Sequence, residues 1–369
     1  MMRTASTRIA RLAVLARIGL LACIALDAHA AATAGQAPQP AVPAPAAQAP
    51  AAPREADAVG VALTDARALI DRGQAKDAVA KLLALARPDD PRVLHVLGVA
   101  YYHADAEQQA VTVLERVRER LPDGSIERRE AEQVLGLSLH LLGRSAEAIP
   151  WLERTRAWAV DNLELNFVLG QAYIQTNQPD AARTALARTF DLPADAPAAH
   201  VVAAQLMIRL KMETLAEAEL AAALKKDPRT PRANFLLGQM ALFRGRLDEA
   251  IERSTREIAV NPADAEAFAQ VGDAYVRQGK WDEAIRALQQ SIWLNPYYSS
   301  PYILLGRAYL KKDQPSTAEG MLRRAIAFDP NNRMAHYLLA QLLQQTGRTD
   351  EAKREFAIAE QLQAQSGRP

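Results

Sequence analysis

Four glutamines occupy equivalent places in a sequence that repeats every 34 residues. They are Gln171, Gln205, Gln239 and Gln341, and the first three follow one another at intervals of 34. A glutamine amide offers N–H donors and a carbonyl acceptor, so it can pair with a peptide backbone or with sugar hydroxyls. The pattern predicts a row of binding groups. The alternative interpretation is a set of solvated polar positions on glutamine-rich helices.

A charged set at related spacing offers a second kind of chemistry. It consists of Asp273, Arg277, Arg307 and Lys311. The three cations could together hold a carboxylate, such as the end of a polypeptide chain. A solvated patch of exposed charges is the alternative, because exposed ion pairs form readily without any function.

The residues that support catalysis or metal binding are not arranged for either. The sequence contains no HExxH or CxxC spacing, no glycine-rich phosphate loop and no G-x-S-x-G motif. His95, His103 and His140 can lie on neighbouring helices, but they do not have the spacing of a metal-binding motif. We therefore expect a protein that is not an enzyme and that uses no cofactor or metal ion.

The helices that position these side chains can be predicted from a small residue that occurs once in each 34-residue period. It recurs in steps of 34 at Gly136, Gly170, Ala204, Gly238, Gly272, Gly306 and Ala340. The step from Gly98 to Gly136 is 38, which predicts four inserted residues around 123–126. A second small residue follows in each period, at Ala110, Ala148, Ala182, Ala216, Ala250, Ala284, Ala318 and Ala352. Each period is expected to form two antiparallel helices that approach closely at these small side chains.

Turn and cap signals separate these helices. Gly143, Gly245, Gly279 and Gly347 fall between the two helices of a period, where a left-handed residue is needed. Acidic pairs suited to a helix N-terminus follow at Asp248-Glu249, Asp282-Glu283 and Asp350-Glu351. The pairs that should end a period are Asp227-Pro228, Asn261-Pro262, Asn295-Pro296 and Asp329-Pro330.

Together these motifs resemble the tetratricopeptide-repeat family. Leu305-Gly306, Tyr309, Ala318 and Pro330 match the family pattern L-G-x₂-Y, then A, then P, although its tryptophan is absent throughout. The resemblance implies an all-α, right-handed superhelical solenoid of about nine antiparallel helix pairs. The repeats are expected at about 57–90, 91–128, 129–162, 163–196, 197–230, 231–264, 265–298, 299–332 and 333–366.

The resemblance also implies where ligands bind. In this family the first helix of each pair faces a concave groove, with contacts from the second, fifth, ninth, twelfth and thirteenth positions. The four glutamines and Asp273 and Arg307 fall at the ninth position. Apolar anchors at the fifth and thirteenth positions would be Phe167, Phe235, Phe243 and Tyr337, with ordinary helix packing as the alternative. The family's carboxylate clamp does not match, because Ala269 and Ile303 stand at the fifth position.

The implied function is a scaffold or adaptor that binds a polypeptide segment in this groove. The alternative is a scaffold subunit of an exopolysaccharide or envelope export machine, since exported repeat solenoids resemble such subunits. Either way the partner is a protein or an envelope component. If residues 1–30 are removed, 40 basic residues (44 − 4) face 42 acidic ones (43 − 1), which argues against nucleic acid.

The N-terminus predicts export. Arg3, Arg8 and Arg11 precede an apolar stretch at 18–26, and Ala28-His29-Ala30 has the small-x-small form of a cleavage site. We expect a signal peptide over 1–30, cut after Ala30, and a mature protein in the periplasm or secreted, without a membrane span. The alternatives are an uncleaved anchor and a lipid anchor at Cys23, the only cysteine. Residues 31–56 are rich in alanine and proline and should form a disordered linker.

Overall fold

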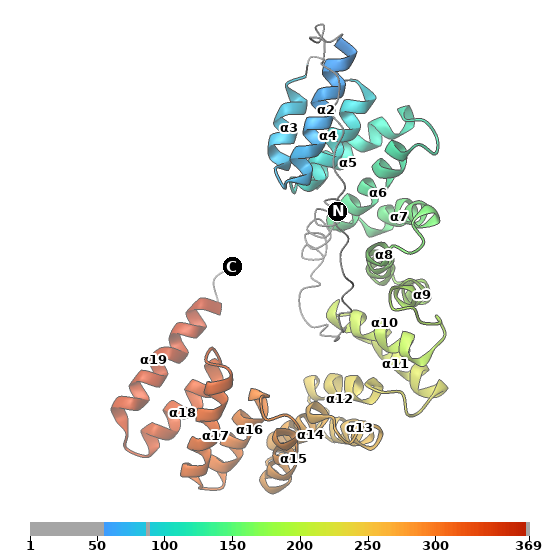
Figure 1. The fold of residues 1–369 in the computed structure, drawn as a ribbon. Coiled ribbons are helices and arrows are strands. Elements are labelled where there is room, and N and C mark those ends of the chain that lie inside the picture. The colour runs from blue at the N-terminus through green and yellow to red at the C-terminus, as the bar shows by residue number, and fades with distance from the viewer. Residues whose placement is uncertain (1–54, 86–88, 367–369) are drawn as a thin grey trace, which may run out of the picture. The chain divides into compact units, whose positions relative to one another are not determined.

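The computed structural model describes residues 55–85 and 89–366, so the predicted signal peptide and nearly all of the predicted linker lie outside it. Within these residues the chain forms eighteen α-helices, one short 3₁₀ turn and no strand (Figure 1). The helices follow one another as nine antiparallel pairs. The all-α repeat fold predicted from the sequence is therefore confirmed.

The chain divides into two compact units, Met1–Asp191 and Leu192–Pro369. The helices of the first unit are α2 (Glu55–Asp71), α3 (Ala75–Leu83), α4 (Pro91–His103), α5 (Glu107–Val117), α6 (Ile126–Leu141), α7 (Ser145–Trp158), α8 (Leu163–Gln175) and α9 (Pro179–Thr189), with the 3₁₀ turn η1 (Arg118–Arg120) after α5. Those of the second unit are α10 (Pro197–Arg209), α11 (Glu213–Lys226), α12 (Ala233–Phe243), α13 (Leu247–Val260), α14 (Ala265–Gln278), α15 (Trp281–Leu294), α16 (Ser299–Lys311), α17 (Pro315–Phe328), α18 (Arg333–Gln345) and α19 (Thr349–Ser366).

Small residues hold the two helices of each pair together, as predicted. A Cβ added to Gly272 of α14 would lie 2.5 Å from Cγ of Leu288 on α15, and one added to Gly306 would lie 2.7 Å from Cγ of Leu322. The alanines of the second helices are almost completely buried, from Ala110 to Ala352. The leucine side chain fills the space above the glycine, so the pair packs at close range.

The turns between paired helices also match the prediction. Gly143, Gly245, Gly279 and Gly347 have φ between +73° and +80°. In other repeats the same left-handed place is taken by Asp105, Asn177, Lys211 and Asp313, with φ between +56° and +61°. The repeat therefore keeps this turn geometry even where a side chain makes it costly.

Caps fix where the first helices begin. Asn162, Asp264 and Asn332 each accept a hydrogen bond from a backbone N–H in the first turn, at 3.0–3.2 Å. The predicted Asp-Pro and Asn-Pro pairs directly follow the ends of the second helices, as at Asp227 after α11. The acidic pairs lie in the first turns of α13, α15 and α19.

The inserted residues before Gly136 change one predicted repeat boundary. After α5 the chain makes the turn η1 and a short loop in which Gly124 has φ +72°. The Oγ of Ser125 accepts a hydrogen bond from the backbone N–H of Arg128 at 3.1 Å, so α6 begins at Ile126. The boundary expected between 128 and 129 consequently falls inside α6.

Candidate functional site

A groove of about 310 Å³ crosses the first helices of three successive repeats in the second unit. We call it the first-helix groove. Its walls come from α12, α14 and α16, and its lining residues are Phe235, Gln239, Leu242, Glu266, Ala269, Gln270, Asp273, Tyr298, Ser300 and Leu304. It brings together three residues predicted from the sequence, namely Phe235, Gln239 and Asp273. They come from the fifth and ninth positions of their repeats, which share one face of a first helix.

The apolar part of the groove is formed by side chains that are already packed. Phe235 is only 5% exposed, and the guanidinium carbon of Arg232 lies 3.6 Å from the centre of its ring. Gln239, one turn further along α12, is exposed. A ligand would therefore meet an ordered apolar floor beside a solvated amide, which is the combination that holds an extended peptide.

Carboxylates dominate the polar rim of this groove. Asp273 accepts two hydrogen bonds from Arg277, at 3.0 and 2.9 Å, and Glu266 lies 3.0 Å from Arg232. Burial raises the pKa of Tyr298, and the negative charges of Glu266 and Asp273 raise it further. The Tyr298 hydroxyl consequently stays protonated and can donate a hydrogen bond to a bound acceptor.

The four predicted glutamines do not form one continuous surface. Gln171, in the first unit, is only 6% exposed and lies beside His140. Gln205 and Gln239 are exposed on α10 and α12. Gln341 is half-buried, and its Nε2 donates to the hydroxyl of Tyr337 at 3.1 Å. Only Gln239 lines the first-helix groove.

The predicted aromatic anchors also differ from one another. Phe167 is 9% exposed, so it packs between helices in the same way as Phe235. Phe243 is 83% exposed at the end of α12. Tyr337 is partly exposed and meets Phe356 of α19 edge to face, with ring centres 5.7 Å apart. Among these four, Phe235 lines the groove and Phe243 is the most exposed to solvent.

The three predicted cations lie on two helices. Arg277 on α14 is paired with a carboxylate, and the two cations on α16 are not. Arg277 is held by Asp273 and also donates to the backbone carbonyl of Leu242 at 3.1 Å. Arg307 and Lys311 lie one turn apart on α16, and both are exposed. Neither forms an ion pair within the part of the chain that the structure describes. The two cations available to a carboxylate are therefore Arg307 and Lys311.

Several groove residues were not singled out from the sequence. Glu266 and Ser300 are at the second position of their repeats and Leu242 is at the twelfth, so the family positions contain the signal that finds them. Tyr298 precedes α16 and faces the groove from the loop after α15. Its place depends on how two neighbouring repeats pack, which the positions within one repeat do not encode.

A smaller groove crosses α4, α6 and α8 in the first unit, with a volume of about 200 Å³. Its walls include Val99, Leu137 and Val168, and Glu130 and Glu164 supply carboxylates. The ninth positions of α4 and α6, Val99 and Leu137, are apolar, whereas those of the second unit are polar. The two units therefore present grooves of the same kind with different chemistry.

The histidines considered as metal ligands make other contacts. The Nε2 of His95 lies 3.0 Å from Glu130, and the Nδ1 of His140 lies 3.3 Å from the Oγ of Ser145. His103 meets Tyr102 edge to face. Across 55–85 and 89–366, no three His, Cys, Asp or Glu side chains are grouped so as to hold a metal ion.

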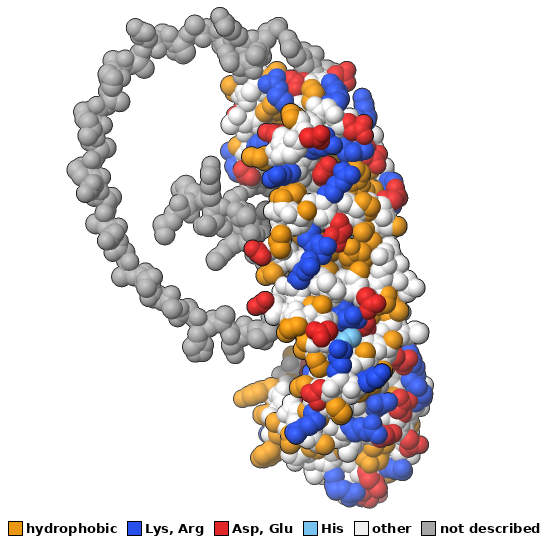
Figure 2. All heavy atoms as spheres, turned by 90° about the vertical axis from the view of Figure 1, so that its right-hand side faces the viewer, with side chains coloured by type: hydrophobic (Ala, Val, Ile, Leu, Met, Phe, Trp, Pro, Cys, Tyr) orange, Lys and Arg blue, Asp and Glu red, His pale blue; other side chains and the backbone are white. Residues whose placement is uncertain are grey.

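The surface carries charges of both signs. On the face shown in Figure 2, lysines and arginines are interspersed with aspartates, glutamates and hydrophobic side chains. Many of these charges are paired, as in Arg244 with Glu213 at 2.5 Å. In the same described part of the chain, none of the helices is long and apolar enough to cross a membrane.

The helices form pairs that pack closely at small residues and repeat every 34 residues, and grooves cross successive first helices. These features are typical of a repeat-solenoid binding protein. Tetratricopeptide-repeat family models match residues 139–206, 275–342 and 309–367, and a second model of the same description matches 214–265 and 244–298. The chain belongs to the tetratricopeptide-repeat family. Proteins of this family typically act as non-enzymatic scaffolds that bind protein partners, and membership of the family supports a protein-interaction scaffold here.

Solved structures give partial similarities. The crystal structure of MamA is 26% identical, over 43% of this chain and 93% of that one, with a TM-score of 0.39. A thermophilic tetratricopeptide-repeat protein of Thermus thermophilus is 24% identical, over 45% and 91%, with a TM-score of 0.38. The Cut9-Hcn1 structure is 19% identical, over 77% and 55%, with a TM-score of 0.42. A comparison with curated protein sequences gives no match.

Proposed function

We propose that this protein is a scaffold that binds an extended polypeptide segment in the first-helix groove of its second unit. One observation carries the proposal. Apolar, amide and carboxylate groups from α12, α14 and α16 line one continuous groove across three repeats. A segment lying along such a groove can bury apolar side chains while its backbone pairs with Gln239 and Tyr298.

The charges of the groove indicate what kind of segment fits. Glu266 and Asp273 line it, and their negative charges add to burial in raising the pKa of Tyr298. The arginines that pair with them, Arg232 and Arg277, do not line it. A segment with a lysine or arginine among apolar residues would place its cation near these carboxylates, whereas an acidic segment would be repelled.

Selection from a displayed random peptide library, with the purified full chain as bait, tests this proposal. Recovered peptides should share apolar residues around a basic one. The double variant Gln239→Ala/Leu304→Ala should bind them about tenfold or more weakly. The control is Gln361→Ala, which removes an exposed amide of α19 and should change nothing. Selection of no common motif, or equal binding by the double variant, would refute the groove as the binding site.

The location of this activity is also a proposal. The arginines and apolar stretch of residues 1–30 favour export, so the scaffold would act in the periplasm or outside the cell. Cell fractionation followed by N-terminal sequencing of the purified protein tests this. A mature N-terminus at Ala31 in the exported fraction supports the proposal, and an intact Met1 in the cytoplasmic fraction overturns it.

A further inference from the structure

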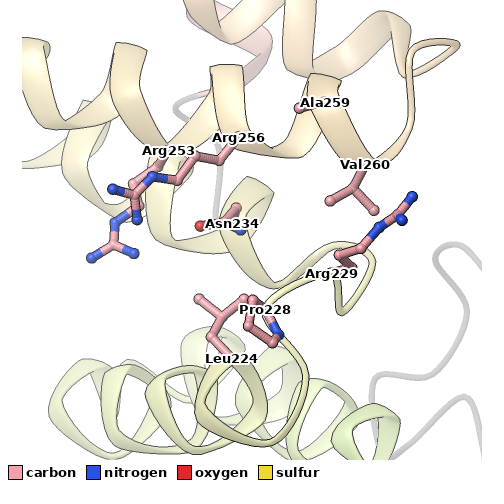
Figure 3. Close-up of a pocket in the computed structure, with 8 residues that line it drawn as sticks. All are labelled: Leu224, Pro228, Arg229, Asn234, Arg253, Arg256, Ala259 and Val260. Carbon is pink, nitrogen blue, oxygen red and sulfur yellow. The ribbon is translucent and has the colours of Figure 1, made fainter.

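A second pocket, of about 580 Å³, opens between α11, α12 and α13 (Figure 3). Three arginines line it, Arg229, Arg253 and Arg256, and we call it the arginine pocket. Leu224 and Pro228 supply apolar surface. It does not share a lining residue with the first-helix groove. The residues Asn234 and Phe235 are consecutive on α12, and the first lines the arginine pocket while the second lines the groove.

Asn234 is the polar group at the centre of this pocket. It is only 3% exposed, and its Oδ1 accepts no hydrogen bond from the residues that the structure describes. Figure 3 shows its side chain between Arg253 and Arg256 on one side and Arg229 on the other. A buried carbonyl oxygen without a donor is unfavourable, so it marks a place where a ligand can supply the missing hydrogen bond.

Equivalent places in other repeats are filled internally. In two repeats of the same unit, a histidine of the first helix meets a glutamate of the second. The Nδ1 of His200 lies 2.6 Å from Glu219, and that of His336 lies 2.6 Å from Glu355. In the repeat of α12 and α13, the same two positions hold Asn234 and Arg253. An internal histidine–glutamate contact is thus replaced by an amide and a cation, and the amide has no charge with which to neutralise the cation.

The arginines keep donors for a ligand. The Nε of Arg253 is 4.0 Å from Glu249, and an Nη of Arg256 is 2.5 Å from Glu252. No ion pair of the Arg229 side chain is found within 55–85 and 89–366. A guanidinium has more N–H groups than these contacts use, and they are well suited to a carboxylate. The pocket therefore favours an anion despite the two nearby glutamates.

We propose that the arginine pocket binds a small hydroxylated carboxylate of the sugar-acid class, free or as a unit of a polysaccharide. The arginines bind the carboxylate, a hydroxyl donates to the Oδ1 of Asn234, and Leu224 and Pro228 contact the carbon skeleton. Inorganic phosphate also carries an O–H near neutral pH, but it has no carbon skeleton to contact Leu224 and Pro228. The volume is within the range of small-ligand pockets. This site shares no lining residue with the peptide groove proposed above.

Titration calorimetry of the full chain with sodium glucuronate tests this inference. Glucose and inorganic phosphate at matched ionic strength are the comparison ligands, and an oligogalacturonate separates a polymer unit from a free acid. A peptide ending in a free carboxylate represents a chain terminus. We expect saturable binding of glucuronate, weaker binding of phosphate and of the peptide, and none of glucose. Tighter binding of the oligogalacturonate would identify the polysaccharide as the source.

Two variants locate the site. Arg253→Gln and Asn234→Leu should each weaken glucuronate binding about tenfold or more. Leucine occupies the equivalent place at Leu94, and Asn234 has no internal partner for its Oδ1, so Asn234→Leu should keep or raise the melting temperature. The matched control is Asn166→Leu, at the same repeat position. Its Oδ1 also lacks a partner among the described residues, but Ala185 stands at the place equivalent to Arg253.

Unchanged affinity in Arg253→Gln would overturn the inference, and so would equal binding of phosphate or of the peptide. The absence of saturable glucuronate and oligogalacturonate binding would do the same. If Asn234→Leu melts at a much lower temperature, Asn234 is structural, and the Arg253→Gln result then decides alone. The peptide selection described above is unaffected by either variant, so the two proposals can fail separately.

Discussion

Arg67 of α2 joins Glu130 of α6 by two hydrogen bonds, at 3.2 and 2.8 Å, although α4 lies between these helices in the sequence. His95 of α4 completes the contact, with its Nε2 3.0 Å from the same carboxylate. Three successive first helices are thus held by one glutamate. In a repeat protein each repeat otherwise packs only against its neighbours, so such a contact adds stability across two successive interfaces between repeats.

Replacing this glutamate should loosen the first repeats. Glu130→Gln should lower the local stability of α2 and α4 by about 2 kcal/mol, because it removes a charged acceptor from two donors. Native-state hydrogen exchange measures the change, with the amides of α14 as the internal control. Equal protection in α2 before and after the substitution would show that the contact contributes nothing.

The same contact should make the first repeats sensitive to acid. Burial tends to raise the pKa of Glu130, but the contacts with His95 and Arg67 prevail and lower it from 4.5 to about 2. A lowered pKa stabilises the fold above pH 4.5, and this contribution is lost as the pH falls from there towards 2. The protection factors of the α2 amides, corrected for the intrinsic exchange rate at each pH, should therefore fall over this range more in the native protein than in Glu130→Gln.

The crossing glycines should not tolerate a methyl group. Gly272→Ala should destabilise the protein by about 1–3 kcal/mol, because the new Cβ would meet the side chain of Leu288. Gly320 of α17 is the matched control, since a Cβ there meets nothing within 4 Å. Gly320→Ala should stabilise the protein by up to about 1 kcal/mol through helix propensity. Denaturant unfolding of both variants compares the two effects, which must have opposite signs.

The left-handed turns offer a stabilising substitution. Lys211 adopts φ +61°, a conformation that glycine takes without cost. Lys211→Gly should raise stability by about 1 kcal/mol. The reverse change, Gly245→Lys, places a side chain at φ +73° and should lower it by a similar amount. A lower melting temperature for Lys211→Gly would mean that its side chain makes a contact that outweighs the backbone strain.

The start of α12 depends on a residue of the next helix. Glu257 of α13 is fully buried, and its carboxylate accepts hydrogen bonds from the backbone N–H groups of Arg232 and Phe235, at 2.6 and 3.1 Å. Glu257→Ala should cost about 3 kcal/mol, because both donors lose their acceptor in a buried place. Glu257→Gln keeps one acceptor oxygen and should cost less. Thermal melting of the two variants gives their order.

The repeat fold could be predicted because its determinants are local. A small residue at the place of Gly272 recurs every 34 residues from Gly136 onward, and a proline follows several of the second helices, so the sequence contains these determinants many times over. The start of α12 was not predictable in the same way. Its capping group comes from Glu257, and Arg232 takes φ +67°, so the geometry depends on a contact between helices.

The candidate site was predictable only in part, for a related reason. The family positions placed Phe235, Gln239 and Asp273 on the groove face, and all three line one groove in the structure. They treated Gln171 as equivalent to Gln239, yet Gln171 is buried beside His140 of the preceding repeat. Positions within a repeat fix which face a side chain is on. Whether a neighbouring repeat covers that face depends on side chains some thirty residues away.

Because Asn234 lines the arginine pocket and Phe235, the next residue, lines the first-helix groove, α12 forms a wall of both sites. A ligand that displaces α12 when it binds in one of these sites therefore changes the volume of the other site. Thermodynamic reciprocity then requires that each occupant change the affinity of the other by the same factor. Measuring the affinity for the peptide with and without the sugar acid yields this factor. A value of one would show that neither ligand displaces α12.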